Sequence, residues 1–324
     1  MKVLIPFCLL FLFFYVDSAS TTERPYTYEN MMTDIQHVGD LFPKGLQVGT
    51  IGRSEWGKEI PYVQIGMGQR HILLIGTHHA REWITSKFLM KLVHQYAARY
   101  AEDPFIGDLL DEISVVVIPM LNPDGVQIQQ QGLKGDYPIS KLKLLGMNHF
   151  SWNYKRWKAN GEGVDLNRQY PADWEALKKI PAWPAYKQYR GERPVQAKEV
   201  AAVVDFTEKM EPLIALAYHT SGQEVYWYYH TEKERIVRDY SLAEKIAHMT
   251  GYEVAMPESD AVGGGYTDWF LTTFQRPAFT IEMCTSVHET NPPLSCLKEE
   301  YEHNVAVPLM LIHELLQHNF SFHQ

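Results

Sequence analysis

The chain has 324 residues, a formal net charge of −9 at pH 7 and an isoelectric point of about 5.9. This length allows one large α/β domain or two small ones. The acidic balance excludes nucleic acid as a partner and offers no polybasic patch for a membrane surface.

Residues 1–19 have the pattern of a secretory signal peptide. Lys2 is followed by an apolar stretch from Val3 to Val16 and by small residues at 18–20, where we expect cleavage. The stretch is short for a transmembrane helix, and an uncleaved anchor is the alternative. No later stretch is long and apolar enough to span a bilayer. We therefore expect a secreted or extracytoplasmic protein on the cell-wall side, without a transmembrane segment once the signal is removed.

The part of the chain that follows this leader is expected to be one domain. Residues 20–26 are interpreted as a short exposed linker, and the domain extends over 27–324. Its first predicted elements are a helix over 28–42 and strands over 48–51 and 60–65.

The stretch from His71 to Glu82 carries the first candidate site residues. The short apolar run over 71–76 predicts a buried strand of the parallel type, and helical spacing follows from residue 84 to 100. His79 and Glu82 thus lie between the carboxyl end of a strand and the first turn of a helix, where open α/β sheets bind ligands. Because they are three residues apart, an imidazole and a carboxylate lean to one side, which suits a zinc ion. Taken alone, the pair also fits an ordinary helix start.

The middle of the chain offers weaker signals. A strand is predicted over 113–119, and the Asn-Pro-Asp-Gly sequence at 122–125 is interpreted as a turn. Residues 127–160 show no clear period, so we assign them to long surface loops near the cleft.

Two further apolar runs end at residues that suit the same chemistry. The run over 213–218 ends at His219, and the run over 278–281 ends at Glu282. A core histidine would explain His219 alone, and an edge salt bridge would explain Glu282 alone. Together with His79 and Glu82, however, two histidines and a carboxylate with an open fourth position define a catalytic site for one Zn²⁺ ion per chain.

Helices are expected over 195–210, 235–249 and 299–317. Strands that alternate with helices predict a single α/β domain with a mixed, largely parallel sheet and helices on both faces. Cys284 and Cys296 remain after the leader is removed, and in an exported chain they are expected to pair in a disulfide. Two free thiols are the alternative.

Five segments in their order along the chain resemble the zinc carboxypeptidase family. They are His-Ala-Arg-Glu-Trp at 79–83, Asn-Pro-Asp-Gly at 122–125, Gly-Val-Asp-Leu-Asn-Arg at 163–168, Tyr-His at 218–219 and Phe-Thr-Ile-Glu at 279–282. A weaker resemblance, through residues 157–174 and 218–224, is to the bacterial γ-D-glutamyl–diamino-acid peptidases. The resemblance implies a zinc carboxypeptidase-like fold and a peptide or muropeptide substrate. There is no room for the inhibitory pro-segment of the digestive members, so we expect synthesis as an active enzyme.

The resemblance also implies roles for residues near the metal. Asn167 and Arg168 occupy the positions that hold a terminal carboxylate, for which a guanidinium fork is well matched. Asp165 is expected to orient a zinc-bound histidine, His79. Arg81 lends positive charge to the substrate subsites. Two residues are candidates for the cation that stabilises the tetrahedral oxyanion. Alignment with the family on the tryptophan at 157 points to Lys158, whereas the family's use of an arginine points to Arg156.

The pocket for the substrate's terminal residue departs from the digestive pattern. The position of their mobile tyrosine reads here as Asp260, and Tyr266 is a candidate substitute. Thr267 stands where the family sets side-chain preference, which indicates neither an apolar nor a basic pocket. Asp260 is expected to meet a cationic amine such as the free amino-acid end of diaminopimelate.

The sequence therefore predicts zinc-assisted hydrolysis of an amide bond near a free carboxyl terminus. Glu282 is the expected general base, which later returns a proton to the leaving amine. Cleavage of peptidoglycan-type peptides is the first hypothesis, and general trimming of C-terminal residues is the second. A catalytically silent secreted binding module on the same fold is the third.

Overall fold

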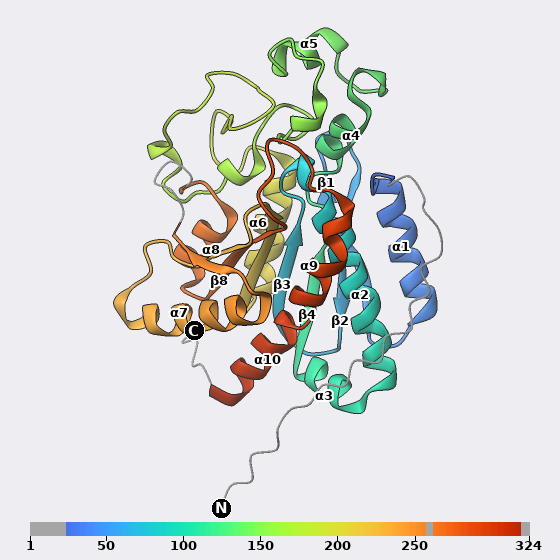
Figure 1. The fold of residues 1–324 in the computed structure, drawn as a ribbon, viewed down its shortest axis with the longest axis vertical. Coiled ribbons are helices and arrows are strands. Elements are labelled where there is room, and N and C mark those ends of the chain that lie inside the picture. The colour runs from blue at the N-terminus through green and yellow to red at the C-terminus, as the bar shows by residue number, and fades with distance from the viewer. Residues whose placement is uncertain (1–23, 257–261, 319–324) are drawn as a thin grey trace, which may run out of the picture.

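The computed structural model describes residues 24–256 and 262–318 (Figure 1). Within these ranges one eight-stranded sheet has the order β1-β2-β4-β3-β5-β8-β6-β7. The strands are β1 (Leu46–Arg53), β2 (Glu59–Ile65), β3 (Arg70–Gly76), β4 (Ile113–Ile118), β5 (Ile214–Thr220), β6 (Glu224–Tyr226), β7 (Glu253–Ala255) and β8 (Ala278–Met283). The three runs that the sequence ties to a metal site, β3, β5 and β8, are consecutive in the sheet.

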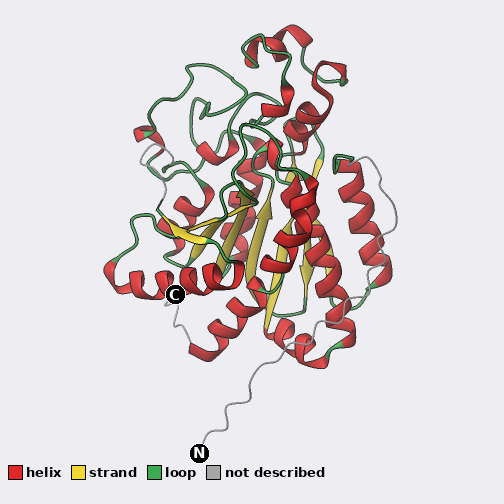
Figure 2. Ribbon diagram, viewed as in Figure 1, coloured by secondary structure: helices red, strands yellow, loops and turns green. Residues whose placement is uncertain are grey.

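The sheet is mixed. Its centre, β4-β3-β5-β8, is parallel, whereas β1 and β2 pair antiparallel at one end and β6 pairs antiparallel with β8 near the other. Because parallel strands end at the same edge, the residues that follow β3, β5 and β8 meet there. Figure 2 shows long loops gathered beyond one end of the sheet.

Helices cover both faces of the sheet, as predicted (Figure 1). The helices are α1 (Tyr28–Leu41), α2 (Ile84–Glu102), α3 (Pro104–Glu112), α4 (Pro123–Gln131), α5 (Lys141–Met147), α6 (Lys198–Met210), α7 (Lys233–Thr250), α8 (Tyr266–Phe274), α9 (Leu297–Asn304) and α10 (Val307–His318). One apolar core packs α1, α2, α3, α7, α9 and α10 on one face, and a second packs α6 and α8 on the other.

Alternation along the strands explains the two cores. In β3, Ile72 and Leu74 belong to the first core, and Leu73 and Ile75 belong to the second. All four are fully buried, so the strand appears in the sequence as an unbroken apolar run.

Three sequence interpretations are corrected by the structure. The Asn-Pro-Asp-Gly segment begins helix α4: the Asn122 side chain accepts the N–H of Gly125, and Pro123 stands at the first turn, where its missing N–H is harmless. Residues 127–160 accordingly include α4 and α5 rather than loops alone. The closing helix is two helices, α9 and α10, with Pro308 in the first turn of the second, because proline cannot donate within a helix interior.

The predicted Cys284–Cys296 disulfide is present. The expected signal peptide over 1–19 lies outside the described residues. Across 24–256 and 262–318, no helix has both the length and the apolar character needed to cross a membrane.

Candidate metal centre and active site

Three side chains converge beyond the ends of β3 and β5. His79 follows β3 and caps a short 3₁₀ turn that contains Glu82, while His219 is the second-last residue of β5. The Nδ1 atoms of the two imidazoles lie 3.1 Å apart, and they lie 2.8 Å and 2.9 Å from the two carboxylate oxygens of Glu82. All three residues are buried.

This donor set fits a zinc ion. One ligand atom from each of the three residues lies within 4.8 Å of the others, and two are imidazole nitrogens and one is a carboxylate oxygen. Burial lowers the pKa of His219, which keeps its imidazole neutral and able to coordinate a metal. His79, Glu82 and His219 would hold the ion and leave a coordination position for a further ligand.

Asp165 and Lys158 lie behind His79. The Oδ1 atom of Asp165 lies 3.2 Å from Nε2 of His79, and its Oδ2 atom lies 3.3 Å from Nζ of Lys158. Burial raises the pKa of Asp165, but the charges of Lys158 and His79 outweigh burial and hold that pKa well below its usual range. Asp165 is therefore a buried, charged carboxylate that lies beside the imidazole.

Glu282 lies beside the metal-binding group. It is the direct cross-strand partner of His219 in the parallel pair β5–β8, and it lines the same pocket. Burial and the nearby charge of Glu82 raise its pKa to about 8. A divalent cation held by Glu82 would oppose this shift. A carboxylate with a pKa near neutrality is suited to accept and return a proton.

A pocket extends from this group between β8, α8 and the aromatic segment after β6. It is lined by His79, Lys158, Asn167, Arg168, His219, Tyr226, Trp227, Tyr228, Val262, Gly265, Thr267, Asp268, Leu271, Ala278, Thr280 and Glu282. The structure thus brings Asn167, Arg168 and Thr267 into one cavity with the metal-binding residues. Its lining is mixed: the Thr267 and Thr280 hydroxyls hydrogen bond at 2.9 Å, and Val262, Leu271 and Ala278 add apolar surface.

The structure distinguishes between the two candidates for the cation that stabilises the oxyanion. Lys158 lines the pocket, whereas the Arg156 guanidinium stacks 3.8 Å from the ring centre of Tyr186 and donates to Asn148. Burial lowers the pKa of Lys158, and the Asp165 carboxylate opposes that shift. Lys158, rather than Arg156, therefore lines the pocket together with the metal-binding residues.

Tyr266 does not take the position that the sequence proposed for it. Its ring is fully buried between Tyr170 and Trp269, and its hydroxyl lies 3.2 Å from that of Thr207. At the start of α8 the Tyr266 side chain belongs to the second core, whereas the next two residues, Thr267 and Asp268, line the pocket. Asp260 lies outside the described residues.

Several pocket residues were missed in the sequence. Thr280 is two residues before Glu282 on β8, so the alternation of side chains places both on one face. That spacing was a usable signal. Trp227 and Tyr228 gave none, because a short segment after a three-residue strand has no period.

Comparisons with known proteins agree with this geometry. The zinc carboxypeptidase family model matches residues 31–307. A γ-D-glutamyl-L-diamino acid endopeptidase 1 from Lysinibacillus sphaericus is 33% identical over 292 residues, which cover 88% of this chain and 72% of the relative. Mouse carboxypeptidase A6 is 27% identical over 248 residues, which cover 71% of this chain and 51% of that protein. The crystal structure of thrombin activatable fibrinolysis inhibitor is similar in fold, with a TM-score of 0.74, 17% identity, and coverage of 90% of this chain and 77% of that one.

The chain belongs to the zinc carboxypeptidase family. With the histidine, glutamate and histidine of the metal-binding group in place, it is a zinc metallopeptidase that uses one Zn²⁺ ion.

Proposed function

We propose that this zinc peptidase hydrolyses the amide bond between a γ-linked D-glutamyl residue and a diamino acid in peptidoglycan-type peptides. The proposal is supported by the 33% identical relative, whose name states that activity. The observation that carries it is a set of polar groups in the pocket beside the metal-binding group. The Thr267 and Thr280 hydroxyls hydrogen bond to each other, and Asp268 adds a carboxylate. These groups suit a side chain that ends in charged atoms better than an aliphatic or aromatic one.

The proposed roles follow from position. Arg168 and Asn167 bind the free carboxylate of the leaving residue in the pocket. When bound, the zinc ion polarises the scissile carbonyl and lowers the pKa of water. Glu282 accepts a proton from the attacking water and hands one to the departing amine. Lys158 stabilises the negative charge that develops on the carbonyl oxygen. Asp165 keeps the His79 ring in one orientation.

Export is part of the same proposal. Residues 1–19 have the composition of a signal peptide, residues 20–26 that of a linker, and the catalytic domain follows over 27–324. The Cys284–Cys296 disulfide supports an oxidising compartment, such as the cell-wall side of a membrane.

A product assay tests the proposal. Zinc-loaded protein is incubated with the tripeptide L-Ala-γ-D-Glu-diaminopimelate, and with ordinary peptides that have free or amidated C-termini, and products are identified by mass. Release of diaminopimelate from the tripeptide is expected. Release of C-terminal residues from ordinary peptides, without cleavage of the tripeptide, would establish a general metallocarboxypeptidase instead. No cleavage of any substrate would favour a silent binding module.

The general carboxypeptidase is the second candidate. Arg168 in the pocket favours it, because a guanidinium that binds a terminal carboxylate serves any peptide with a free C-terminus. The polar groups of Thr267, Asp268 and Thr280 in the pocket favour the first candidate over it.

A further inference from the structure

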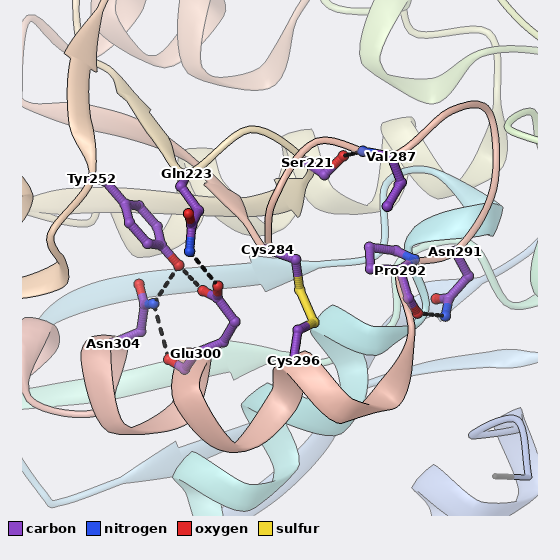
Figure 3. Close-up of a disulfide and its surroundings, with 10 residues drawn as sticks. All are labelled: Ser221, Gln223, Tyr252, Cys284, Val287, Asn291, Pro292, Cys296, Glu300 and Asn304. Atoms are coloured by element: carbon purple, nitrogen blue, oxygen red, sulfur yellow. Dashed lines mark hydrogen bonds between the residues drawn. A yellow bond between two sulfur atoms is a disulfide. The ribbon is translucent and has the colours of Figure 1, made fainter.

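The loop that follows the catalytic strand is held firmly at its base. Cys284 comes two residues after Glu282, and its disulfide to Cys296 closes the loop just before α9 (Figure 3). The Ser221 hydroxyl accepts the N–H of Val287 at 2.9 Å, also drawn in Figure 3. The loop tip, residues 288–290, is therefore carried on a base that is tied both to α9 and to the segment after β5.

Glu289 at this tip forms two ion pairs. Its Oε1 atom accepts a hydrogen bond from Nζ of Lys187 and lies 3.9 Å from Nη1 of Arg81. Burial raises the pKa of Glu289, but the hydrogen bond from Lys187 and the charges of Lys187, Arg81 and Arg156 outweigh burial and lower it. Its side chain is 39% exposed, so it can leave these partners for solvent.

The cations around Glu289 are held by the active-site framework. The backbone N–H next to Lys187, that of Gln188, donates to Oδ2 of Asp165 at 3.0 Å. On the other side of Lys187 in the sequence, the backbone carbonyl of Tyr186 accepts the backbone N–H of Lys158 at 2.8 Å. Arg81, Arg156 and Lys187 together form what we call the cation cluster. It contains three positive charges, and Glu289 is the acidic partner that Lys187 and Arg81 share.

The cation cluster lies outside the pocket. Arg168 lines the pocket, whereas none of the cluster residues does. Arg81 stands in sequence between the metal ligands, and its charge acts on both Lys158 and Glu282. A substrate whose terminal residue fills the pocket carries its acyl side past Glu282 and out of the pocket, and Arg81 is the cation of the cluster whose charge reaches Glu282.

We propose that the Glu289 carboxylate occupies a binding subsite for a substrate carboxylate, and that the cation cluster selects an anionic residue on the acyl side of the scissile bond. The inference rests on the proposed function, because a glutamyl residue linked through its γ-carboxyl keeps a free α-carboxylate. That carboxylate takes the place of Glu289 on Lys187 and Arg81, and Glu289 moves into solvent. A guanidinium and an ammonium bind carboxylates through charge-assisted hydrogen bonds.

A matched pair of substrates isolates this subsite. One is L-Ala-γ-D-Glu-diaminopimelate, and the other is the same tripeptide with the glutamyl α-carboxyl converted to an amide. We expect zinc-loaded wild type to prefer the carboxylate by about tenfold or more in kcat/KM, which corresponds to roughly 1.4 kcal/mol. A preference near one would overturn the proposal.

Two variants assign the preference to named residues. Lys187→Gln is expected to reduce the ratio of the two kcat/KM values to about twofold or less, since it removes the closer cation. Glu289→Gln removes the internal competitor, so KM for the carboxylate substrate falls by about threefold or more. Lys178→Gln, an exposed lysine on the preceding segment, is the control and leaves both rates unchanged. An unaltered ratio in Lys187→Gln, or an unaltered KM in Glu289→Gln, contradicts the proposal.

The proposed function and the carboxylate subsite can fail separately. Cleavage of both tripeptides at equal rates would leave the proposed function standing and remove the carboxylate subsite. If neither tripeptide is cleaved, the proposed function fails, and the subsite is judged on ordinary peptides with glutamate or glutamine before the terminal residue. A glutamate preference that Lys187→Gln abolishes supports the subsite, and equal rates overturn it.

Discussion

The Oδ1 atom of Asp165 lies 3.2 Å from Nε2 of His79, while Nδ1 of the same ring faces Glu82. With Nε2 next to the Asp165 carboxylate, Nδ1 is the ring nitrogen of His79 that lies with Glu82 and with Nδ1 of His219. Asp165 also accepts the backbone N–H groups of Asn167 and Gln188, so its own position is set by the loops around it.

Asp165→Asn is expected to weaken zinc binding by roughly 10- to 100-fold, because an amide cannot hold the imidazole as a carboxylate does. Competition with a chelating dye measures the change in Kd. Asp205→Asn, on the exposed side of α6, is the control. Equal zinc affinity in wild type and Asp165→Asn would show that the contact does not orient His79.

Glu282→Gln should keep zinc and lose turnover. The variant retains the size of the side chain but cannot accept a proton, so kcat falls by about a hundredfold or more. Metal analysis of the purified protein gives the zinc content, and steady-state kinetics give kcat. Glu253→Gln on the exposed edge of β7 should leave both unchanged. Turnover close to wild type in Glu282→Gln would remove this residue from the mechanism.

Metal removal should abolish activity reversibly. Protein stripped with a chelator is expected to be inactive and to recover with one equivalent of Zn²⁺, since the described residues bring together one three-ligand group. His219→Ala should not recover, because two protein ligands remain. His248→Ala, exposed in the last turn of α7, serves as the control. Full recovery of His219→Ala would show that the ion is held elsewhere.

Arg168→Gln tests recognition of the terminal carboxylate. A charge-assisted hydrogen bond contributes about 1.5–3 kcal/mol, so kcat/KM for substrates with a free C-terminus should fall by about 10- to 100-fold. Rates on C-terminally amidated peptides, which lack the carboxylate, should change far less. Arg193→Gln is an exposed control. A similar loss on free and amidated substrates would mean that Arg168 acts on the fold rather than on the carboxylate.

Glu199 predicts a pH dependence of stability. Burial and the charge of Asp124 raise its pKa from 4.5 to about 8 in the folded chain. Between these values the folded state binds more protons than the unfolded state, so this group makes stability fall as pH rises, by up to about 1.4 kcal/mol per pH unit. Glu199→Gln cannot titrate, and its stability should therefore decline less steeply from pH 5 to pH 8.

The measurement for Glu199 is urea unfolding at several pH values, with zinc removed so that metal binding adds no proton linkage of its own. The readout is the slope of the free energy of unfolding against pH. Loss of the carboxylate oxygen that accepts the Asn160 side-chain N–H changes the free energy of unfolding equally at every pH, so it leaves this slope unchanged. Glu208→Gln, exposed on the same helix, should keep the wild-type slope. Parallel curves for wild type and Glu199→Gln would contradict the raised pKa.

The centre of the fold and the metal ligands could be predicted because the information is local. Strands β3, β5 and β8 are short apolar runs, and each has a ligand or acid at its carboxyl end. Parallel strands then bring those ends together without any knowledge of side-chain packing. The sequence signal for the helix start at Asn122 and Pro123 was equally local, but the same residues are also typical of turns, so the signal was ambiguous.

The remaining site residues depend on contacts that have no sequence pattern. Lys158 and Arg156 are two residues apart around a 3₁₀ turn, and only packing against Tyr186 decides which one faces the pocket. The pair of Lys187 and Glu289 spans 102 residues and joins two irregular segments. Such loops carry no period from which a contact can be inferred.

The register of β5 against β8 fixes the spacing of two residues in the active site. His219 and Glu282 are paired positions in one hydrogen-bonded ladder, so a metal ligand and the proposed proton acceptor cannot separate unless the sheet itself breaks. Their amide protons should be among the last in the chain to exchange with heavy water. The spacing between the metal ligand and the proposed proton acceptor is therefore set by the backbone of the sheet and not by the surrounding loops.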